Sequence, residues 1–427
     1  MQKLKAIDLF AGAGGFSLAA FKAGVDVQAA IELDKLASET YYKNLVIKFG
    51  AQTQVFSQDI NDVDIDSLMR FQGLKQDELD LLLGGPPCQG FSSHRINDAG
   101  INDPRNSLLL RYFDFVRKLR PKVFLVENVP GLLWPRHAEY LDNFISLTRE
   151  HGYQVIGDKP YVLNARDYGV PQNRKRAFIL AVRDDIQTND LLWPPEATYT
   201  KTGQQIWPTA SSVFERPAQS ILIEFKERLV EKFNFTAEMA ESCIDQLQWG
   251  SPIAQDDSCA IHMIHSKEMT TLFENTPLMG DRIESGRQLN CHKNYGGHLD
   301  VYGRIYPHFP SNTITTGCNN PSKGRFVHPW LPHGISLRHA ARLQTFPDDY
   351  AFVGGTMAIA KQIGNAVPVK LGEALLGAII KLLSKQPSLS SKDAREVNCN
   401  KDYTYDEARH VSDSGKDNRS SWAGTNS

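Results

Sequence analysis

The chain has 427 residues, of which 41% are apolar and 22% are charged, and its formal net charge is −2. This length allows one large core plus a smaller second unit, and the composition is that of a globular protein. No apolar run approaches the roughly 20 residues of a membrane span, and no signal peptide precedes the first strand-like segment. The cysteines, which include no close pair, predict neither a disulfide framework nor a zinc site and favour a reducing, cytoplasmic location. With so little net charge, any contact with nucleic acid must come from a local basic surface.

Strand and helix signals alternate along the first part of the chain, which predicts a parallel α/β sheet. The strand-like apolar runs are 4–9, 25–31, 54–57, 79–83, 123–126, 161–164 and 177–182. Ligands bind at the carboxyl ends of the strands in such sheets. The residues that follow these runs are therefore the first candidates for a functional site.

The periodicity weakens after about residue 185 and returns as two helix-like stretches at 336–346 and 369–383. We expect the first part of the main domain at 1–185 and an irregular inserted domain at 186–335. The main domain then returns at 336–384, and a disordered tail follows at 385–427. An insert at the edge of a rigid scaffold usually serves recognition, although a solvated loop domain is the alternative.

A glycine-rich turn, Phe10 to Gly15, follows the first predicted strand and opens a helix. Such a turn brings backbone N–H groups close to a ligand, and Glu32 at the end of the next strand suits ribose hydroxyls. Taken alone the pattern fits NAD, FAD, S-adenosylmethionine or a plain tight turn, but its glycine spacing departs from the dinucleotide fingerprint G-x-G-x-x-G. Asp59, after a third strand, is placed either to accept a hydrogen bond from an adenine amino group or to cap a helix.

Cys88 lies just past an all-apolar strand, in the loop Gly84 to Ser92. Two prolines stiffen this loop, and its Gly, Gln and Ser residues favour a reactive cysteine over a buried inert one. The remaining cysteines lack such a setting and are predicted to be structural or incidental.

Glu127 ends the next apolar strand, which places its carboxyl group at the same sheet edge as Cys88 and able to donate a proton there. The alternative is a carboxylate that caps the following turn. Arg174 and Arg176 are two residues apart, so on an extended strand both point the same way, toward a nucleobase carbonyl, a phosphate or Glu127, unless they form a solvated edge. Asn365, in a turn before the last helix, either closes a cofactor pocket or caps that helix.

Taken in order, these motifs resemble those of the DNA cytosine-5-methyltransferases of the prokaryotic restriction-modification type. The resemblance covers nearly all of 4–383 apart from the variable middle. The segments that carry it are Phe10-Ala11-Gly12-Ala13-Gly14-Gly15-Phe16, Gly85-Pro86-Pro87-Cys88-Gln89-Gly90-Phe91-Ser92, Glu127-Asn128-Val129, Gln172-Asn173-Arg174-Lys175-Arg176, Ala340 to Asp348 and Gln362-Ile363-Gly364-Asn365. In addition, Asn312 to Gly317 resembles a family element near the DNA-facing surface.

The resemblance implies a Rossmann-like, S-adenosylmethionine-dependent methyltransferase domain and a smaller target recognition domain, with double-stranded DNA bound between them. It implies that the target cytosine is flipped out of the helix. The Cys88 thiolate would add to carbon 6, so that carbon 5 can attack the methyl group. Glu127 would hold ring nitrogen 3 and the exocyclic amine, while Arg176, with Arg174, would hold the carbonyl oxygen and lower the thiolate pKa. The base that removes the carbon 5 proton, a water or a side chain, is not identified, and 92–106 would form a lid.

The same resemblance implies contacts for the cofactor, for its product S-adenosylhomocysteine and for the substrate, without a metal. The expected cofactor contacts are Phe10, Ala11, Gly12, Gly14, Gly15, Glu32, Asp59, Ile60, Pro87, Asn365 and Ala366. The expected substrate contacts, beside the catalytic Cys88, Glu127, Arg174 and Arg176, are Gln89, Ser92, Gln172 and Thr315.

Three alternatives are open to the sequence. A tRNA-methylating relative would carry a Cys-Phe-Thr tripeptide, which is absent, and basic residues outnumber acidic ones in the later part of the insert. A non-catalytic DNA-binding relative is disfavoured by the intact Cys88, Glu127 and Arg176. A nicotinamide or flavin oxidoreductase is disfavoured by the glycine spacing. We expect a monomeric, stand-alone enzyme associated with the nucleoid through DNA, with a cognate restriction endonuclease acting on the same site as a candidate partner.

Overall fold

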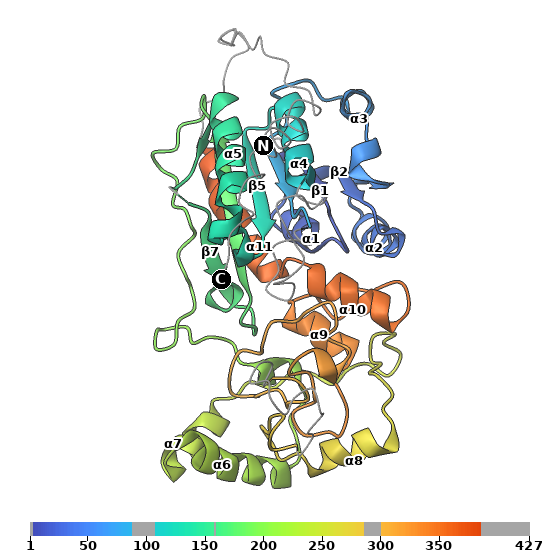
Figure 1. Cartoon of the computed structure of the whole chain (residues 1–427), viewed down its shortest axis with the longest axis vertical. Coiled ribbons are helices and arrows are strands. Elements are labelled where there is room, and N and C mark those ends of the chain that lie inside the picture. The colour runs from blue at the N-terminus through green and yellow to red at the C-terminus, as the bar shows by residue number, and fades with distance from the viewer. Residues whose placement is uncertain (1–2, 88–106, 158, 286–299, 386–427) are drawn as a thin grey trace, which may run out of the picture. The chain divides into compact units, whose positions relative to one another are not determined.

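Short apolar runs form a sheet at the centre of the fold (Figure 1). The computed structural model describes residues 3–87, 107–157, 159–285 and 300–385. Its strands are β1 (Lys5–Leu9), β2 (Asp26–Glu32), β3 (Gln54–Ser57), β4 (Leu81–Gly84), β5 (Val123–Asn128), β6 (Tyr153–Val155), β7 (Tyr161–Asn164) and β8 (Lys175–Arg183). The order across the sheet is β3-β2-β1-β4-β5-β8-β6, with β7 also paired to β8.

The prediction of a parallel sheet is correct for the pairs among β1 to β5 and wrong for β8, which is the reversed strand. The pairs among β3, β2, β1, β4 and β5 are parallel. In contrast, β8 runs antiparallel to β5, β6 and β7. A parallel return needs a crossover of a dozen or more residues, and the short link from β7 to β8 does not provide one. The three-residue strand β6 was not predicted.

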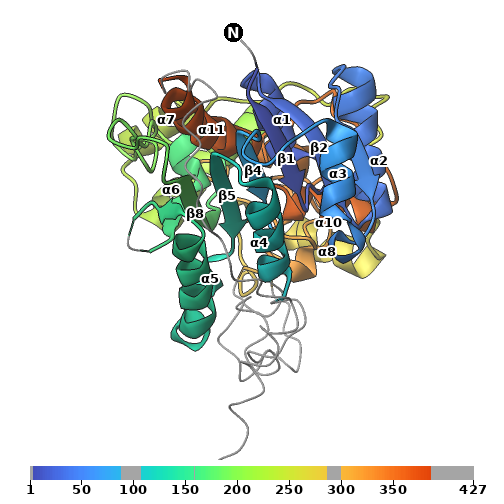
Figure 2. The same cartoon turned by 90° about the horizontal axis from the view of Figure 1, so that it is seen from above.

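Alternate side chains of the central strands point into two separate apolar layers. Leu81 and Leu83 of β4 pack into the layer that contains α1 (Gly15–Lys22) and α11 (Val369–Ser384). Leu82 packs into the layer that contains α3 (Ile65–Gln72), α4 (Ser107–Leu119) and α5 (Ala138–Glu150). This period-2 alternation is what a sheet covered on both faces requires (Figure 2).

The insert contains helices that the sequence interpretation missed. They are α6 (Gln219–Phe233), α7 (Ala237–Asp245) and α8 (Lys267–Asn275). In α6 only Leu222, Phe225 and Leu229 are buried, so its apolar stripe is narrow and its sequence pattern is weak. In Figure 1, α9 and α10 lie between these helices and the sheet. None of the helices in the described ranges has both the length and the apolar character that a membrane span requires.

The C-terminal return contributes three helices, α9 (Leu337–Leu343), α10 (Thr356–Asn365) and α11. The first begins at a capping box formed by Ser336 and His339, and it ends before the predicted Phe346. Asn365 is the last residue of α10 rather than part of a turn, and Pro368 stands at the N-cap of α11, so Asn365 does not cap α11. The helix α2 (Lys35–Tyr41) continues into a π-helix at Tyr42–Lys48.

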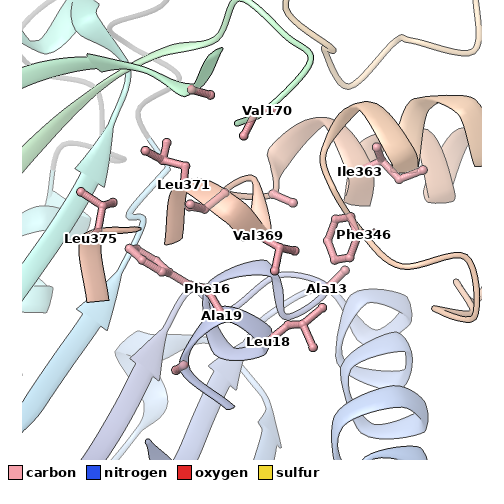
Figure 3. Close-up of a cluster of buried hydrophobic side chains, with 14 of the residues drawn as sticks. Ala13, Phe16, Leu18, Ala19, Val170, Phe346, Ile363, Val369, Leu371 and Leu375 are labelled. Carbon is pink, nitrogen blue, oxygen red and sulfur yellow. The ribbon is translucent and has the colours of Figure 1, made fainter. Parts of the chain in front are cut away.

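The return is held to the first half of the chain by the contact of α11 with α1. Figure 3 shows Phe16 and Ala19 of α1 beside Leu371 and Leu375 of α11, and all four side chains are buried. The contact is close because α11 has a glycine there. A Cβ atom on Gly372 would lie 2.7 Å from the Cβ of Ala19.

We predict that Gly372→Ala lowers the free energy of unfolding by about 1–3 kcal/mol, because the added methyl group overpacks the α1–α11 contact. Gly377→Ala in the same helix is the matched control, since a Cβ atom there meets nothing within 4 Å. It should stabilise the protein by up to about 1 kcal/mol through helix propensity. Urea denaturation of both variants measures the difference, and equal shifts would contradict the packing argument.

Candidate active site

The glycine-rich turn after β1 has one open side and one packed side. Phe10, Gly12 and Gly14 adopt left-handed backbone conformations, with φ of 58°, 56° and 88°. A Cβ atom on Gly12 would meet nothing within 4 Å, whereas one on Gly14 would lie 2.7 Å from Leu45 and one on Gly15 would lie 2.5 Å from the Val367 carbonyl oxygen. The turn therefore presents Gly12 to open space and uses Gly14 and Gly15 to pack against the protein.

Glu32 ends β2 directly beside this turn. Its Oε2 accepts a hydrogen bond from the Gly12 N–H at 2.9 Å, and its Oε1 accepts one from the Asp34 N–H at 2.7 Å. Burial raises the pKa of Glu32, and these two backbone donors oppose the rise. Each oxygen keeps acceptor capacity for a further donor, such as a ligand hydroxyl.

Asp59 and Ile60 form the next corner of the same sheet edge. Asp59 caps the short 3-10 helix Ile60–Asp62, because its Oδ1 accepts a hydrogen bond from the Asn61 N–H at 2.9 Å. Arg111 of α4 holds this segment in place by donating hydrogen bonds to the carbonyl oxygens of Ile60 (3.1 Å) and Val63 (2.7 Å). The helix-cap alternative for Asp59 is thus confirmed, and a contact with adenine stays a prediction.

Glu127 and Arg176 meet at the edge where β5 ends and β8 begins. Arg176 Nε lies 2.8 Å from Glu127 Oε1, and both side chains are largely buried. The contact is an ion pair without a well-directed hydrogen bond, since Oε1 has no hydrogen-bond donor. Burial lowers the pKa of Arg176, and the charge of Glu127 opposes this. A Cβ atom on Gly85 would lie 3.1 Å from Glu127 Oε2, so the carboxylate lies against the start of the loop after β4.

The backbone that leads into this loop is tightly held. Asn128 Nδ2 donates to the Pro86 carbonyl oxygen at 3.4 Å, and the Tyr112 hydroxyl donates to the Leu82 carbonyl oxygen at 2.9 Å. Pro87 is the last residue of this segment in the described part of the chain and is exposed. The predicted site residues Cys88, Gln89 and Ser92 lie outside the described residues.

Arg174 has different partners from Arg176. Its Nη1 donates to the Ile314 carbonyl oxygen, and its Nη2 donates to the carbonyl oxygens of Gly364 and Ala366. It precedes β8 and is 1% exposed. The two arginines therefore do not serve one shared group, contrary to the expectation from their spacing, and a catalytic role for Arg174 stays a prediction.

Gln172 is fully buried, with 0% exposure. Its Nε2 donates to the Leu343 carbonyl oxygen and to Gln344 Oε1, and its Oε1 accepts from the Ile314 N–H. The amide has no exposed surface, so its geometry does not support the predicted substrate contact. By contrast, Thr315 is half-buried and Asn365 is exposed, which leaves both able to meet a ligand.

Asp8 of β1 is a buried titratable group that the sequence interpretation did not consider. Its Oδ2 accepts a hydrogen bond from the Ser17 hydroxyl at 2.6 Å, which ties β1 to α1 beneath the glycine-rich turn. Burial raises the pKa of Asp8 to about 7, and the nearby charge of Glu32 adds to the rise. Arg111 was also missed, because nothing in the pattern of α4 distinguishes it from a surface arginine.

Comparison with known proteins identifies a family. The family model for C-5 cytosine-specific DNA methylases matches residues 4–381. The Type II methyltransferase M.XorII of Xanthomonas oryzae pv. oryzae is 30% identical over 395 residues, covering 90% of this chain and 87% of the relative. The Type II methyltransferase M.DdeI of Desulfomicrobium norvegicum is 30% identical over 393 residues, covering 86% of each chain.

Solved structures share the fold. A protein described as a DNA modification methyltransferase of prophage origin (E. coli) matches with a TM-score of 0.61 at 22% identity, covering 90% of this chain and 100% of that chain. The methyltransferase EhMeth of Entamoeba histolytica matches with a TM-score of 0.54 at 15% identity, covering 90% and 99%. The fold is thus the Rossmann-like α/β fold expected from the sequence.

We predict that Asp8→Asn reduces the pH dependence of stability. The folded state holds a proton on Asp8 up to about pH 7, whereas the unfolded state releases it near pH 4. Between these values the folded protein binds more protons, so its free energy of unfolding falls as the pH rises, by on the order of 4 kcal/mol in total. Urea titrations at pH 5 and pH 8 should give a smaller difference for Asp8→Asn than for the wild type. The exposed Asp142→Asn should keep the wild-type difference, and an unchanged slope in Asp8→Asn would refute the assignment.

Proposed function

The chain belongs to the C-5 cytosine-specific DNA methylase family and is a DNA cytosine-5-methyltransferase, and on this premise we propose how its residues carry out the reaction. The substrate is a cytosine within a specific double-stranded DNA sequence, and the protein acts as the protective methylase of a restriction-modification system. The single observation that carries the proposal is the ion pair of Glu127 and Arg176 beside Gly85, where the loop to Cys88 begins.

S-adenosylmethionine fits the open side of the glycine-rich turn. A side chain on Gly12 would fill this space, and the Glu32 carboxylate lies at its edge with capacity to accept ribose hydroxyls. When bound, the cofactor supplies an electrophilic methyl group on a sulfonium. The direct contacts in this proposal are Phe10, Ala11, Gly12, Glu32, Asp59, Ile60, Pro87 and Asn365. Gly14, Gly15 and Ala366 shape the turn and its packing.

The chemistry at the base belongs to Cys88, Glu127 and Arg176. Cytosine carbon 5 is a poor nucleophile, and addition of the Cys88 thiolate to carbon 6 of the flipped-out base turns the ring into an enamine. Glu127 places a proton on ring nitrogen 3, where negative charge develops, and accepts a hydrogen bond from the exocyclic amine. After carbon 5 takes the methyl group, a base removes the proton of carbon 5, and Cys88 leaves carbon 6 by elimination.

Arg176 has two tasks in this scheme. It holds the Glu127 carboxylate in place at 2.8 Å, and its guanidinium binds the carbonyl oxygen of the cytosine. A buried pair of this kind is costly to separate, so it keeps the acid oriented while the site is empty. The incoming cytosine replaces part of the contact between Arg176 and Glu127, and it meets hydrogen-bond donors that are already in position.

DNA recognition is assigned to the insert at 186–335, with Thr315 as a contact at its boundary with the catalytic part. A cognate endonuclease, the monomeric state, the cytoplasmic location and association with the nucleoid stay predictions from the sequence.

We predict that expression in a host lacking cytosine methylation produces 5-methylcytosine at one short recurring sequence, and that Cys88→Ala abolishes it. Mapping of 5-methylcytosine across the host DNA is the measurement. A folded protein that binds S-adenosylmethionine but leaves the DNA unmethylated would contradict the proposal, and RNA would be the next substrate to test.

We further predict that Glu127→Gln and Arg176→Lys each lower the methylation rate by about 10²–10⁴-fold, because general acid catalysis and its orientation are lost. The affinity for S-adenosylhomocysteine should stay within about twofold of the wild type, since neither residue is placed at the cofactor. Lys175→Ala is the matched control, because Lys175 lies between the two motif arginines and its side chain is exposed. Single-turnover rates and calorimetric titrations separate these effects, and a loss of cofactor binding alone would argue against the assigned roles.

A further inference from the structure

One buried guanidinium joins three segments that are far apart in the sequence. Arg174 donates to the carbonyl oxygens of Ile314 at 2.9 Å, of Gly364 at 2.8 Å and of Ala366 at 3.0 Å. Gly364 and Ala366 flank Asn365 at the end of α10, and Ile314 directly precedes Thr315. The Arg174 side chain thus fixes the backbone on both sides of Asn365, which is exposed. It also fixes the backbone just before Thr315, which is half-buried.

Two buried amides reinforce the same link. Gln172 Oε1 accepts from the Ile314 N–H at 2.8 Å, and its Nε2 donates to Gln344 Oε1 at 3.0 Å. Gln344 Nε2 in turn donates to the carbonyl oxygens of Ile363 and Ala366. Both polar groups of the Ile314 backbone are therefore tied to the end of α10, one through Gln172 and Gln344 and the other through Arg174.

The two backbone segments also touch directly. A Cβ atom on Gly364 would lie 2.3 Å from the Thr315 carbonyl carbon and 2.3 Å from the Thr316 nitrogen. Glycine is needed there, because any side chain would push the end of α10 away from Thr315. A displacement of either segment must therefore move the other.

We propose that Arg174 is a positioning residue that couples cofactor binding at Asn365 to DNA binding at Thr315. This inference rests on the proposed function, in which Asn365 contacts the cofactor and Thr315 contacts DNA. It replaces the catalytic role that the sequence predicts for Arg174, because both terminal nitrogens of the guanidinium are occupied by backbone carbonyls.

The coupling follows from the geometry of the guanidinium. It is a planar, rigid fork, so the positions of its three acceptors are not independent. Binding of the cofactor restricts Asn365 and the carbonyl groups beside it, and through Arg174 this restricts Ile314 and Thr315. DNA then meets a Thr315 that is already ordered, which lowers the entropic cost of its binding. Linkage requires the reverse effect of DNA on the cofactor to be equal in size.

The test measures the affinity for a duplex carrying the mapped methylation sequence, with and without saturating S-adenosylhomocysteine. In the wild type we expect the cofactor product to tighten DNA binding by on the order of tenfold. In Arg174→Lys, whose ammonium cannot hold three carbonyls in a plane, this ratio should fall to within about twofold of unity. The reverse titration, product affinity with and without the duplex, should lose the same factor.

Three further variants make the result specific. Gln172→Met cuts the second path to Ile314 without removing a charge, so it should also reduce the ratio even if Arg174→Lys does not fold. Thr313→Val removes the hydrogen bond from the Thr313 hydroxyl to the Asn173 carbonyl oxygen, close to Arg174 in the sequence. It leaves the three carbonyls that Arg174 contacts in place, so the ratio of the DNA affinities with and without product should not change. Gly372→Ala destabilises the fold elsewhere and should keep it as well, which separates coupling from general loss of stability.

The outcomes separate this inference from the proposed function. Asn365→Ala should weaken binding of the product alone, and Thr315→Val should weaken binding of the duplex alone. If both do so while folded Arg174→Lys and Gln172→Met keep the full ratio, the coupling role is wrong and the proposed function stands. If Arg174→Lys lowers only the methylation rate and leaves the ratio intact, Arg174 is catalytic after all. If neither Asn365→Ala nor Thr315→Val affects its ligand, the site assignment and the inference fall together.

Discussion

A buried cation needs acceptors, and this requirement organises the C-terminal half of the fold. Arg174 is almost fully buried, and its partners are backbone carbonyls 140, 190 and 192 residues further along the chain. Without them the charge would remain in the interior uncompensated, at a cost of several kcal/mol. The folded state therefore needs the end of the insert and the end of α10 to lie beside the residue that precedes β8. Polar contacts thus join the C-terminal return to the first part of the chain, in addition to the apolar layers.

Glycine allows the remaining close approaches around this site. Gly15 lies against the Val367 carbonyl oxygen, Gly84 lies against the Tyr112 ring, and Gly364 lies against the backbone of Thr315. At each place a Cβ atom would come within 2.6 Å of its neighbour, a separation that real Cβ atoms essentially never show. The motif glycines thus serve two purposes. Gly12 leaves space for a ligand, Gly15 and Gly364 let one segment of backbone lie directly on another, and Gly84 makes room for the Tyr112 ring.

The residues that end strands were the easiest to predict from the sequence. Glu32, Asp59 and Glu127 each follow an apolar run, and the sheet brings them to one edge as expected. The direction of β8 and the roles of Gln172 and Arg174 were not predictable, because they depend on contacts with segments far away in the sequence. The insert helices escaped notice because narrow buried stripes give weak periodicity. The proposed nucleophile Cys88 was predicted from its loop sequence alone, and it lies outside the described residues.

The reversal of β8 has a consequence for how such a protein can change during evolution. Because β8 is antiparallel to β5, its first residues meet the end of β5, and Glu127 and Asn128 pair with Phe178 and Ala177. The last residue of β8, Arg183, lies at the other edge, just before the start of β5, where its N–H donates to the Lys122 carbonyl oxygen. The insert therefore leaves from the edge opposite Glu127 and Arg176, and it returns to the segment between β7 and β8 where the Tyr199 N–H donates to the Asp167 carbonyl oxygen and the Asn173 N–H donates to the Ser311 carbonyl oxygen. Under the proposed function, most of the insert can diversify, and with it the DNA sequence that is read, without any change at Cys88, Glu127 or Arg176.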